Sequence, residues 1–244
     1  MEKNKMDESS DETKLQHVIK VAQLLRGDLQ QALDFHEKYF QEILQFPFVK
    51  TLYKVYDSEL SEIANPIVDD VSWKLKPLRF SDNLDDAMQE NEHMQMGTSL
   101  FELYLVLQRF AIMAQNIRTL DLGELKMQNY YTWFRKGVAH WLEIALFKAL
   151  QRIEKAVAID ALEPVDSNVR YSSSAVDTLT IYYQVRTFWS QLAWPDVEGS
   201  YSFIAIIIQD ICRCSVFYAD KMEKKVEGMG ETEDAYEKKF EVTN

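Results

Sequence analysis

Apolar residues recur at alternating steps of three and four over long stretches of this sequence. The first such stripe runs from Leu15 to Ile43 and misses a single position, at His36. This spacing places the apolar side chains on one face of an α-helix. The 7 glycines and 5 prolines among 244 residues are under half of average usage, so tight turns must be few. The sequence therefore predicts an all-α fold of six or seven mostly long helices.

Prolines and capping residues set the predicted helix boundaries. Phe46-Pro47 ends the first helix, because the residue before a proline disfavours helical backbone angles. Ser99 and Ser172 to Ser174 are candidate caps at later helix starts. Further helices are predicted over 51–63 (stopped by Asn65-Pro66), 101–117, about 129 to before Pro164, 172–192 and 197–226, with a short helix and a connector over 66–80.

Composition changes along the chain suggest how it is divided. The polar, charged N-terminus is typical of disorder, and the acidic, Met-rich stretch before Gly97 is typical of a flexible loop. We predict a disordered segment 1–12, an N-terminal helical part 13–80, an acidic flexible loop 81–97, a helical bundle 98–228, and an acidic tail or the start of a truncated next helix at 229–244.

The charge balance excludes several classes of partner. A net charge of −12 argues against nucleic acid, which is bound through clustered lysines and arginines. The same charge should repel anionic lipid, and the sequence contains no uncharged apolar run of membrane-spanning length, so no direct membrane insertion is expected. No signal peptide is evident, and Cys212 and Cys214 are expected to be reduced and packed in a helix, which favours the cytosol.

No catalytic or metal-binding pattern stands out. His17, His36, His93 and His140 lack the spacing that puts two ligands on one helical face, and phosphate-loop and nucleophile-elbow motifs are absent. Capping explains Ser172 to Ser174 better than a nucleophile does, and the aromatic clusters are expected in the core. The chain is predicted to be a binding protein or scaffold that uses no cofactor, although an enzyme with dispersed active-site residues stays open.

Several local sequences resemble a known family. They are 130–134 (Tyr-Tyr-Thr-Trp-Phe), Trp141-Leu142, 149–157, 171–177 (Tyr-Ser-Ser-Ser-Ala-Val-Asp), 189–196 (Trp-Ser-Gln-Leu-Ala-Trp-Pro-Asp) and 217–220 (Phe-Tyr-Ala-Asp). In order and spacing they are similar to the first Munc homology region of the MUN domain, over roughly 99–226. The chain thereby resembles the uncoordinated-13 (Munc-13) family of vesicle-priming factors, in its non-neuronal and dense-core-vesicle branches.

The resemblance implies a fold, a role and a location. Family MUN domains are elongated stacks of antiparallel helical bundles that act on syntaxin-type SNARE proteins, their Sec/Munc-family chaperone and the assembled SNARE bundle. A fragment of this kind would promote SNARE assembly before regulated exocytosis, without covalent chemistry. It would be cytoplasmic and recruited peripherally to vesicle or plasma membrane through modules outside this chain. The alternative is a structural helical segment that contacts only its own polypeptide.

The resemblance also assigns candidate partner-binding residues. Better-known family members carry an Asn and a Phe, three residues apart, in a pocket implicated in opening syntaxin. Those two places hold Glu102 and Leu105 here, next to Phe101. The opening activity, if present, would therefore use different side chains. Ordinary helix packing is the alternative reading of all three residues.

Overall fold

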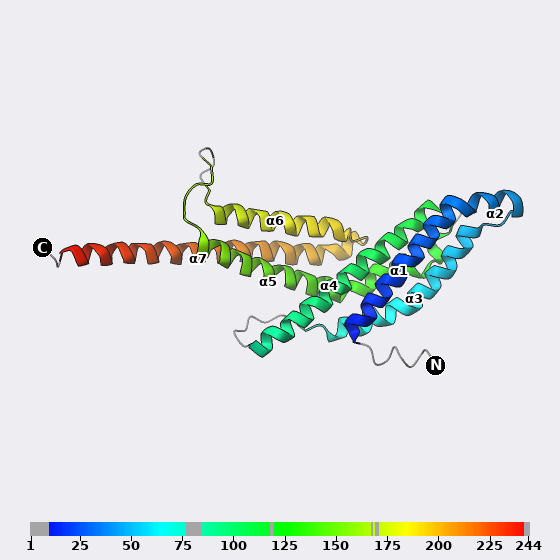
Figure 1. Ribbon diagram of the computed structural model, residues 1–244, viewed down its shortest axis with the longest axis horizontal. Helices are drawn as coiled ribbons and strands as arrows, with labels where there is room; N and C mark the ends of the chain where they lie inside the picture. The colour runs from blue at the N-terminus through cyan, green and yellow to red at the C-terminus, as the bar shows by residue number, and fades with distance from the viewer. Residues whose placement is uncertain (1–9, 77–83, 118–119, 167, 169–170, 242–244) are drawn as a thin grey trace. The chain divides into compact units, whose positions relative to one another are not determined.

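The fold is all-α, as the sequence predicts. A computed structural model describes residues 10–76, 84–117, 120–166, 168 and 171–241, with only the backbone described over 84–92 and 230–241. This part of the chain contains helices and connecting turns but no strand (Figure 1). The elements are α1 (Asp11–Gln31), the π-helical η2 (Ala32–His36), α2 (Glu37–Leu44), α3 (Phe48–Lys74), α4 (Leu84–Met113), the 3-10 helices η3 (Ala114–Asn116), η4 (Leu122–Glu124) and η5 (Lys126–Phe134), α5 (Arg135–Ile159), α6 (Ser173–Leu192) and α7 (Val197–Glu241).

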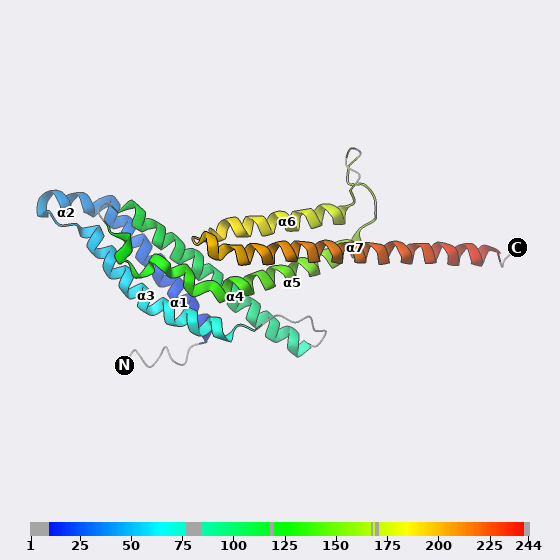
Figure 2. The same ribbon diagram turned by 180° about the vertical axis from the view of Figure 1, so that it is seen from behind.

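The chain divides into two compact units, Met1–Trp141 and Leu142–Asn244, and the division falls inside α5 (Figure 2). The predicted segment boundary at residue 98 lies within α4 and does not separate compact units. Of the predicted disordered segment, 1–9 lies outside the described residues. Helix α1 begins at Asp11 rather than Thr13, because the Ser10 hydroxyl accepts the Thr13 N–H at 3.2 Å and caps it.

In the first unit, α1 packs against both α3 and α4. The stripe that predicted α1 supplies the contact, because Leu15, Val18, Ala22 and Leu29 are buried and most of the polar side chains between them are exposed. Helix α4 contributes most of the opposing surface and is apolar around much of its circumference. The buried residues of these two helices include Leu15, Val18, Ile19, Ala22, Leu29, Leu100, Leu103, Tyr104, Leu107 and Phe110.

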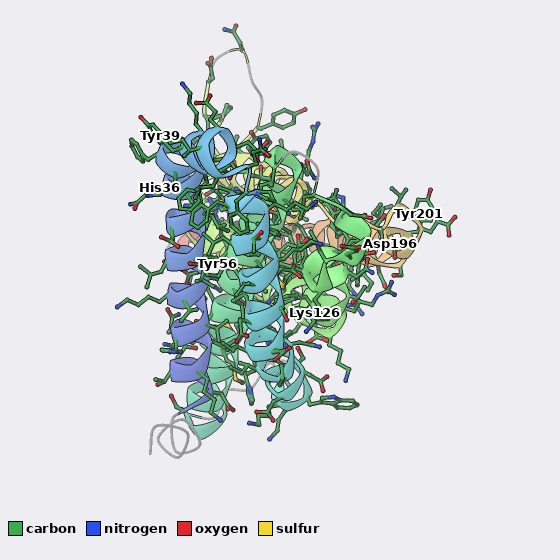
Figure 3. All side chains as sticks on the ribbon, turned by 90° about the vertical axis from the view of Figure 1, so that its right-hand side faces the viewer. His36, Tyr39, Tyr56, Lys126, Asp196 and Tyr201 are labelled. Carbon is green, nitrogen blue, oxygen red and sulfur yellow. The ribbon has the colours of Figure 1, made fainter. Side chains whose placement is uncertain are left out.

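The missed position at His36 marks a real irregularity. The backbone forms the π-helical turn η2 over Ala32–His36 before α2 continues. A π turn adds one residue and rotates everything after it around the helix axis. The later stripe positions therefore leave the core: Tyr39 is 64% exposed and Ile43 is 73% exposed, contrary to the burial predicted for them. Figure 3 shows His36 and Tyr39 projecting outward from this end of the unit.

The predicted stop at Asn65-Pro66 is wrong. Helix α3 runs without a break from Phe48 to Lys74 and contains Pro66 in its interior. The proline cannot donate to the carbonyl of Glu62, but both residues are exposed, so water can satisfy that carbonyl. Val68 and Val71, beyond the proline, are fully buried, and their packing keeps the helix going.

The predicted flexible loop over 81–97 is wrong from Leu84 onward, where the backbone is already the first half of α4. Ser99, predicted to cap a helix start, lies in the middle of α4. Its hydroxyl donates to the Glu12 carboxylate at 2.6 Å and accepts from the Gln16 amide at 3.1 Å. The acidic composition suggested a loop, but no proline interrupts the segment, and α1 supplies hydrogen-bond partners to Ser99 just after it.

The predicted start of the long helix near residue 129 is also corrected. A 3-10 segment, η5, occupies Lys126–Phe134, and regular α-helix begins only at Arg135. The spacing also predicts one apolar face from Phe134, the last residue of η5, along α5 to Val157, and this face is confirmed: of its nine residues all but Ala145 are buried. That face contributes to the core of both units, and its members are Phe134, Val138, Trp141, Leu142, Ala145, Ala149, Ile153, Ala156 and Val157.

In the second unit, residues 142–159 of α5 pack with α6 and α7. A small core of Ala149, Ile153, Val157, Ile181 and Cys214 is closed by half-buried neighbours from all three helices. Helix α7 was predicted to end near Val226, but it continues past Gly228 to Glu241. A glycine inside a helix costs only about 1 kcal/mol relative to alanine, and no proline follows to stop it.

Candidate partner-binding site

Phe101, Glu102 and Leu105 lie together on α4. They occupy positions i, i+1 and i+4, so their side chains form one contiguous patch. Glu102 is exposed, whereas Phe101 and Leu105 are half-buried at its edge. The patch thus offers one carboxylate beside two apolar side chains. Its role in binding a partner stays a prediction.

Buried aromatic side chains form a base under this patch. The Phe101 ring lies 4.9 Å from the Trp141 ring in an edge-to-face arrangement. Tyr104, one turn along α4, is fully buried and lies 5.3 Å from Phe134 and 5.9 Å from Trp141. The Trp141 indole donates to the Gly97 carbonyl at 2.7 Å, which fixes the indole against α4. Phe101 is therefore held on a rigid support.

The tyrosines of this cluster are structural rather than reactive. Burial raises the pKa of Tyr104 to about 12, although hydrogen bonds with Tyr130 and Gln108 work in the opposite direction. Burial, with the neighbouring Tyr104, also raises the pKa of Tyr130. Both hydroxyls are therefore neutral at physiological pH. The expectation that the aromatic clusters are core is confirmed for Tyr130, Phe134, Trp194 and Phe203, which are buried, whereas Tyr201 is 63% exposed. The other members, Tyr131, Trp133, Phe188 and Trp189, are half-buried.

Gly137 lets α5 approach α4 beneath the patch. A Cβ atom at this position would lie 3.0 Å from Leu100 and 3.2 Å from Trp141. Both distances are shorter than ordinary van der Waals contact, so a larger residue would displace the indole that supports Phe101. The sequence could not single out this glycine, because only the tertiary structure brings Leu100 against it.

The serines at the start of α6 surround a buried carboxylate. The Ser172 hydroxyl donates to Asp160 at 2.5 Å, the Ser174 hydroxyl also donates to it, and the Ser174 N–H donates at 3.1 Å. Burial opposes ionisation of Asp160, but these bonds and one from the Leu162 N–H outweigh it and hold its pKa below the usual range. The capping interpretation needs one correction: Asp160, rather than the Ser172 side chain, caps α6.

Helix α7 completes this junction. The Lys225 ammonium group donates to the carbonyl oxygens of Val157, Ala158 and Asp160, at 2.6, 3.2 and 2.5 Å. Carbonyl groups at a helix end have no partner within their own helix, and a cation there also interacts favourably with the helix dipole. The junction therefore ties the end of α5 to α6 and α7, and the hydrogen bonds of its carboxylate are structural.

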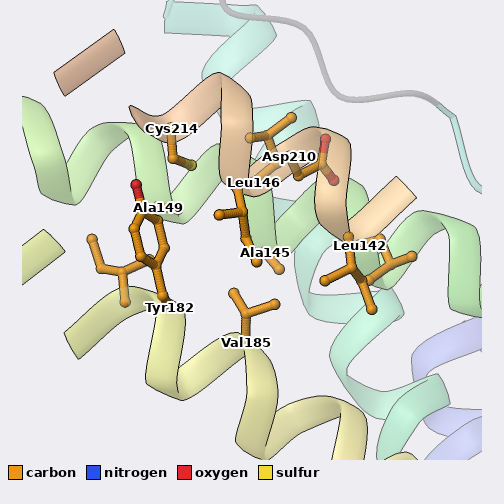
Figure 4. A pocket seen from close by; sticks show the side chains of 11 residues that line it. Leu142, Ala145, Leu146, Ala149, Tyr182, Val185, Asp210 and Cys214 are labelled. Atoms are coloured by element: carbon orange, nitrogen blue, oxygen red, sulfur yellow. The ribbon is translucent and has the colours of Figure 1, made fainter. Parts of the chain in front are cut away.

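A small apolar cavity lies among α5, α6 and α7 (Figure 4). Its volume is about 20 Å³, enough for about one water molecule but not for a metabolite. Burial raises the pKa of Asp210, which lines the cavity, above its usual value, although the neighbouring Arg213 acts in the opposite direction. Cys214 also lines it, whereas Cys212 is exposed, so the burial expected for both cysteines holds for Cys214 only.

Within the part of the chain that the structure describes, no three His, Cys, Asp or Glu side chains are grouped to hold a metal ion. His140 is buried, and its Nε2 lies 3.5 Å from the His93 carbonyl oxygen. This contact lies inside the first unit, where it joins α5 to α4.

One helix is long and apolar enough to cross a membrane by length and composition. It covers Val197–Met229 of α7, with a mean hydropathy of 1.5 in its most apolar window, and 11% of that window is buried. The prediction from uncharged runs excluded such a segment because Asp210 and Arg213 interrupt it. Most of this apolar surface therefore faces outward in the structure.

The chain is similar to several known proteins. It is 45% identical to protein unc-13 homolog 4B of Drosophila melanogaster over 220 residues, which are 90% of this chain and 19% of that protein. It is 28% identical to BAI1-associated protein 3 of Mus musculus over 219 residues, 88% of this chain and 17% of that protein. Protein unc-13 homolog D of Homo sapiens is 31% identical over 131 residues, 54% of this chain and 12% of that protein.

The chain thus spans less than a fifth of the length of these relatives. No family model matches it, and no solved structure matches it. Both unc-13 homologues match at 30% identity or above, and the alignment with homolog 4B covers most of both compact units.

Proposed function

The chain belongs to the unc-13 family, and from that premise we propose that it is a binding region of a vesicle-priming or vesicle-tethering factor. In this role it binds syntaxin-type SNARE proteins and promotes SNARE assembly before regulated exocytosis. The observation that carries the proposal is the 45% identity to unc-13 homolog 4B over 90% of the chain. The role is non-catalytic and needs no cofactor.

The geometry of α4 supports a binding role. The patch of Phe101, Glu102 and Leu105 combines accessible apolar surface with a carboxylate on a rigid aromatic base. An amphipathic helix of a SNARE protein can dock on such a surface through its apolar face. If the patch binds one conformation of syntaxin better than another, it shifts the equilibrium toward that conformation without covalent chemistry.

The further partners are the Sec/Munc-family chaperone of syntaxin and the assembled SNARE bundle. Amphipathic helices of such partners can dock in grooves between helices, which suits a protein whose own described elements are helical. The chain acts in the cytoplasm and is recruited peripherally to vesicle or plasma membrane by modules outside it. The acidic balance of the chain supports this, because a net charge of −12 opposes direct binding to anionic lipid.

A structural role is the second candidate. Large apolar side chains are exposed in both units, for example Phe35 at 66% and Leu44 at 63% in the first and Tyr183 at 68% in the second. Faces of this kind can pack against other helices of the same polypeptide. A purely structural segment would be poorly soluble alone and would bind none of the SNARE proteins.

A pull-down of the 244-residue chain tests the two roles. The baits are syntaxin, the syntaxin–chaperone complex and the assembled SNARE bundle, each against wild type and a Glu102→Lys, Leu105→Asp double variant. We expect wild type to bind and the double variant to lose at least tenfold in affinity while keeping its helical circular dichroism. Loss of binding with intact helicity places the active surface on α4.

A matched control is available within the same unit. Glu59 and Leu24 are exposed, on α3 and α1, and the double variant Glu59→Lys, Leu24→Asp makes the same changes of charge and polarity. It should bind like wild type. Equal binding by all three proteins would show that the binding surface lies elsewhere than at Phe101, Glu102 and Leu105. If wild type binds none of the baits, the structural role is favoured.

A further inference from the structure

Helix α7 carries two apolar stripes on opposite faces. The inner stripe, with Phe203, Ile207, Cys214 and Phe217, faces the packed interior of the second unit. The outer stripe follows the same steps of three and four, but its side chains are exposed. Its members are Tyr201, Ala205, Ile208, Cys212, Val216 and Ala219.

The exposure of the outer stripe is large. Tyr201, Ile208 and Val216 are 63%, 57% and 61% exposed, and Figure 3 shows Tyr201 projecting into solvent. The stripe extends over five turns, or roughly 27 Å at a rise of about 1.5 Å per residue. A contiguous exposed apolar surface of this length is typical of an interaction site. The stripe therefore has the length and pattern of one side of a helix–helix contact.

Charge at its two ends indicates what covers it. Glu198 lies one turn before Tyr201, and Glu223 lies one turn after Ala219, with Asp220 beside it. All three carboxylates are exposed. The stripe is thus apolar in the middle and acidic at both ends.

We propose that the outer stripe of α7 is a docking site for an amphipathic helix of about 20 residues that is apolar along one face and carries lysine or arginine at both ends. The apolar faces pack together, and the basic residues pair with Glu198 at one end and Glu223 at the other. The site lies in the second unit and is distinct from the patch on α4, so this inference does not depend on the proposed function.

A second copy of the chain fits the same face poorly. If two α7 helices pair antiparallel about the middle of the stripe, Glu198 of one copy meets Glu223 of the other. If they pair in parallel, each carboxylate meets its own counterpart. Like charges facing one another across a contact are unfavourable.

A lipid surface also fits poorly. The acidic ends are repelled by anionic headgroups. Crossing a membrane would strip the inner stripe from α5 and α6 and would bring Asp210 and Arg213 into the hydrocarbon, where charged side chains are costly. A basic amphipathic helix avoids each of these costs.

Binding of two designed helical peptides tests the proposal. Both have 20 residues and the same leucine stripe, one with two lysines at each end and the other with two glutamates. Fluorescence anisotropy with the 244-residue chain should give a dissociation constant in the micromolar range for the lysine peptide and at least tenfold weaker binding for the glutamate peptide. The affinity for the lysine peptide should fall as salt is raised.

Three variants sharpen the test. The double variant Ile208→Asp, Val216→Asp should bind the lysine peptide at least tenfold more weakly than wild type does. Ile43→Asp with Val55→Asp, the same changes at exposed positions of the first unit, should leave binding unchanged. Glu198→Lys with Glu223→Lys should reverse the preference, so that the glutamate peptide binds more tightly than the lysine peptide. A reversal cannot result from misfolding.

Several outcomes would overturn the proposal. It is overturned if the lysine peptide does not bind or if both peptides bind with the same affinity. It is also overturned if the control variant loses as much affinity for the lysine peptide as the stripe variant does. If the wild-type chain sediments with phosphatidylcholine and phosphatidylserine vesicles and the Ile208→Asp, Val216→Asp variant does not, the stripe is a lipid-binding surface instead. If analytical ultracentrifugation shows a wild-type dimer that the same variant abolishes, the stripe is a contact with a second copy of the chain.

Discussion

The carboxylate of Asp57, buried on α3, accepts the backbone N–H of Met127 at 3.0 Å. It also accepts the N–H of Lys126 at 2.7 Å. These donors begin η5 and have no partner within that helix. Asp57 therefore caps a segment about 70 residues away in the sequence and holds η5 against α3.

We expect Asp57→Ala to destabilise the first unit by about 1–3 kcal/mol, because it leaves the N–H groups of Lys126 and Met127 without their acceptor. Urea unfolding followed by far-UV circular dichroism measures the loss. Asp57→Asn keeps one acceptor oxygen and should lose less, and Glu59→Ala, at an exposed position of the same helix, should change little. Equal losses from Asp57→Ala and Glu59→Ala would contradict the capping role.

The Asp160 junction makes the stability of the second unit depend on pH. Burial raises the pKa of Asp160, but hydrogen bonds from Ser172, Ser174 and Leu162 outweigh it, so the pKa is lower in the folded chain than in the unfolded one. The ionised form therefore stabilises the fold. This contribution is complete above the unfolded pKa of about 3.9 and is lost as the pH falls below it.

Thermal unfolding of wild type and Asp160→Asn between about pH 7 and pH 3 tests this dependence. The variant should be less stable by about 1–3 kcal/mol at pH 7, because an amide is a weaker acceptor for the serine hydroxyls. The gap should narrow below about pH 4, because the unfolded wild-type chain then takes up a proton at Asp160 that the folded chain does not, whereas the variant has no carboxylate to protonate. A gap that stays constant over this range would show that the ionised carboxylate is not responsible.

Substitutions at Gly27 and Gly137 should differ in their effect on stability. At Gly27, in α1, a Cβ would meet nothing within 4 Å, so Gly27→Ala should stabilise the protein by about 0.5–1 kcal/mol. At Gly137 the added Cβ crowds Leu100 and Trp141, so Gly137→Ala should gain less, and the bulkier Gly137→Val should destabilise by about 1–3 kcal/mol. Thermal melts provide the comparison, and similar gains from both alanines would refute the crowding.

Pro66 offers a site for stabilisation. It lies exposed inside α3, where it removes one helical hydrogen bond. Pro66→Ala restores the donor to the Glu62 carbonyl and should raise stability by about 1–3 kcal/mol. Pro47, which precedes the first residue of α3, loses no helical bond, and Pro47→Ala should change stability little. A Pro66→Ala variant no more stable than wild type would mean that this part of α3 gains nothing from the bond.

The sequence by itself determined the class of fold and much of its core. The steps of three and four predicted the buried stripe of α1 as far as Leu29 and the apolar face from Phe134, at the end of η5, to Val157 in α5, because these signals are local to each helix. The break at Phe46-Pro47 was equally local. The sequence also brought Phe101, Glu102 and Leu105 together, since spacing alone places them side by side on any helix.

Only the tertiary structure decided the rest, because it depends on contacts between residues distant in the sequence. Packing of α3 carries the helix through Pro66, and hydrogen bonds from α1 engage Ser99 inside α4 rather than at a helix start. In the sequence, Asp57 and Asp160 cannot be told apart from surface carboxylates; only the fold buries them beside backbone N–H donors. The stripes of α7 have the same periodicity, and only the packing of α5 and α6 decides that the inner one is covered and the outer one exposed.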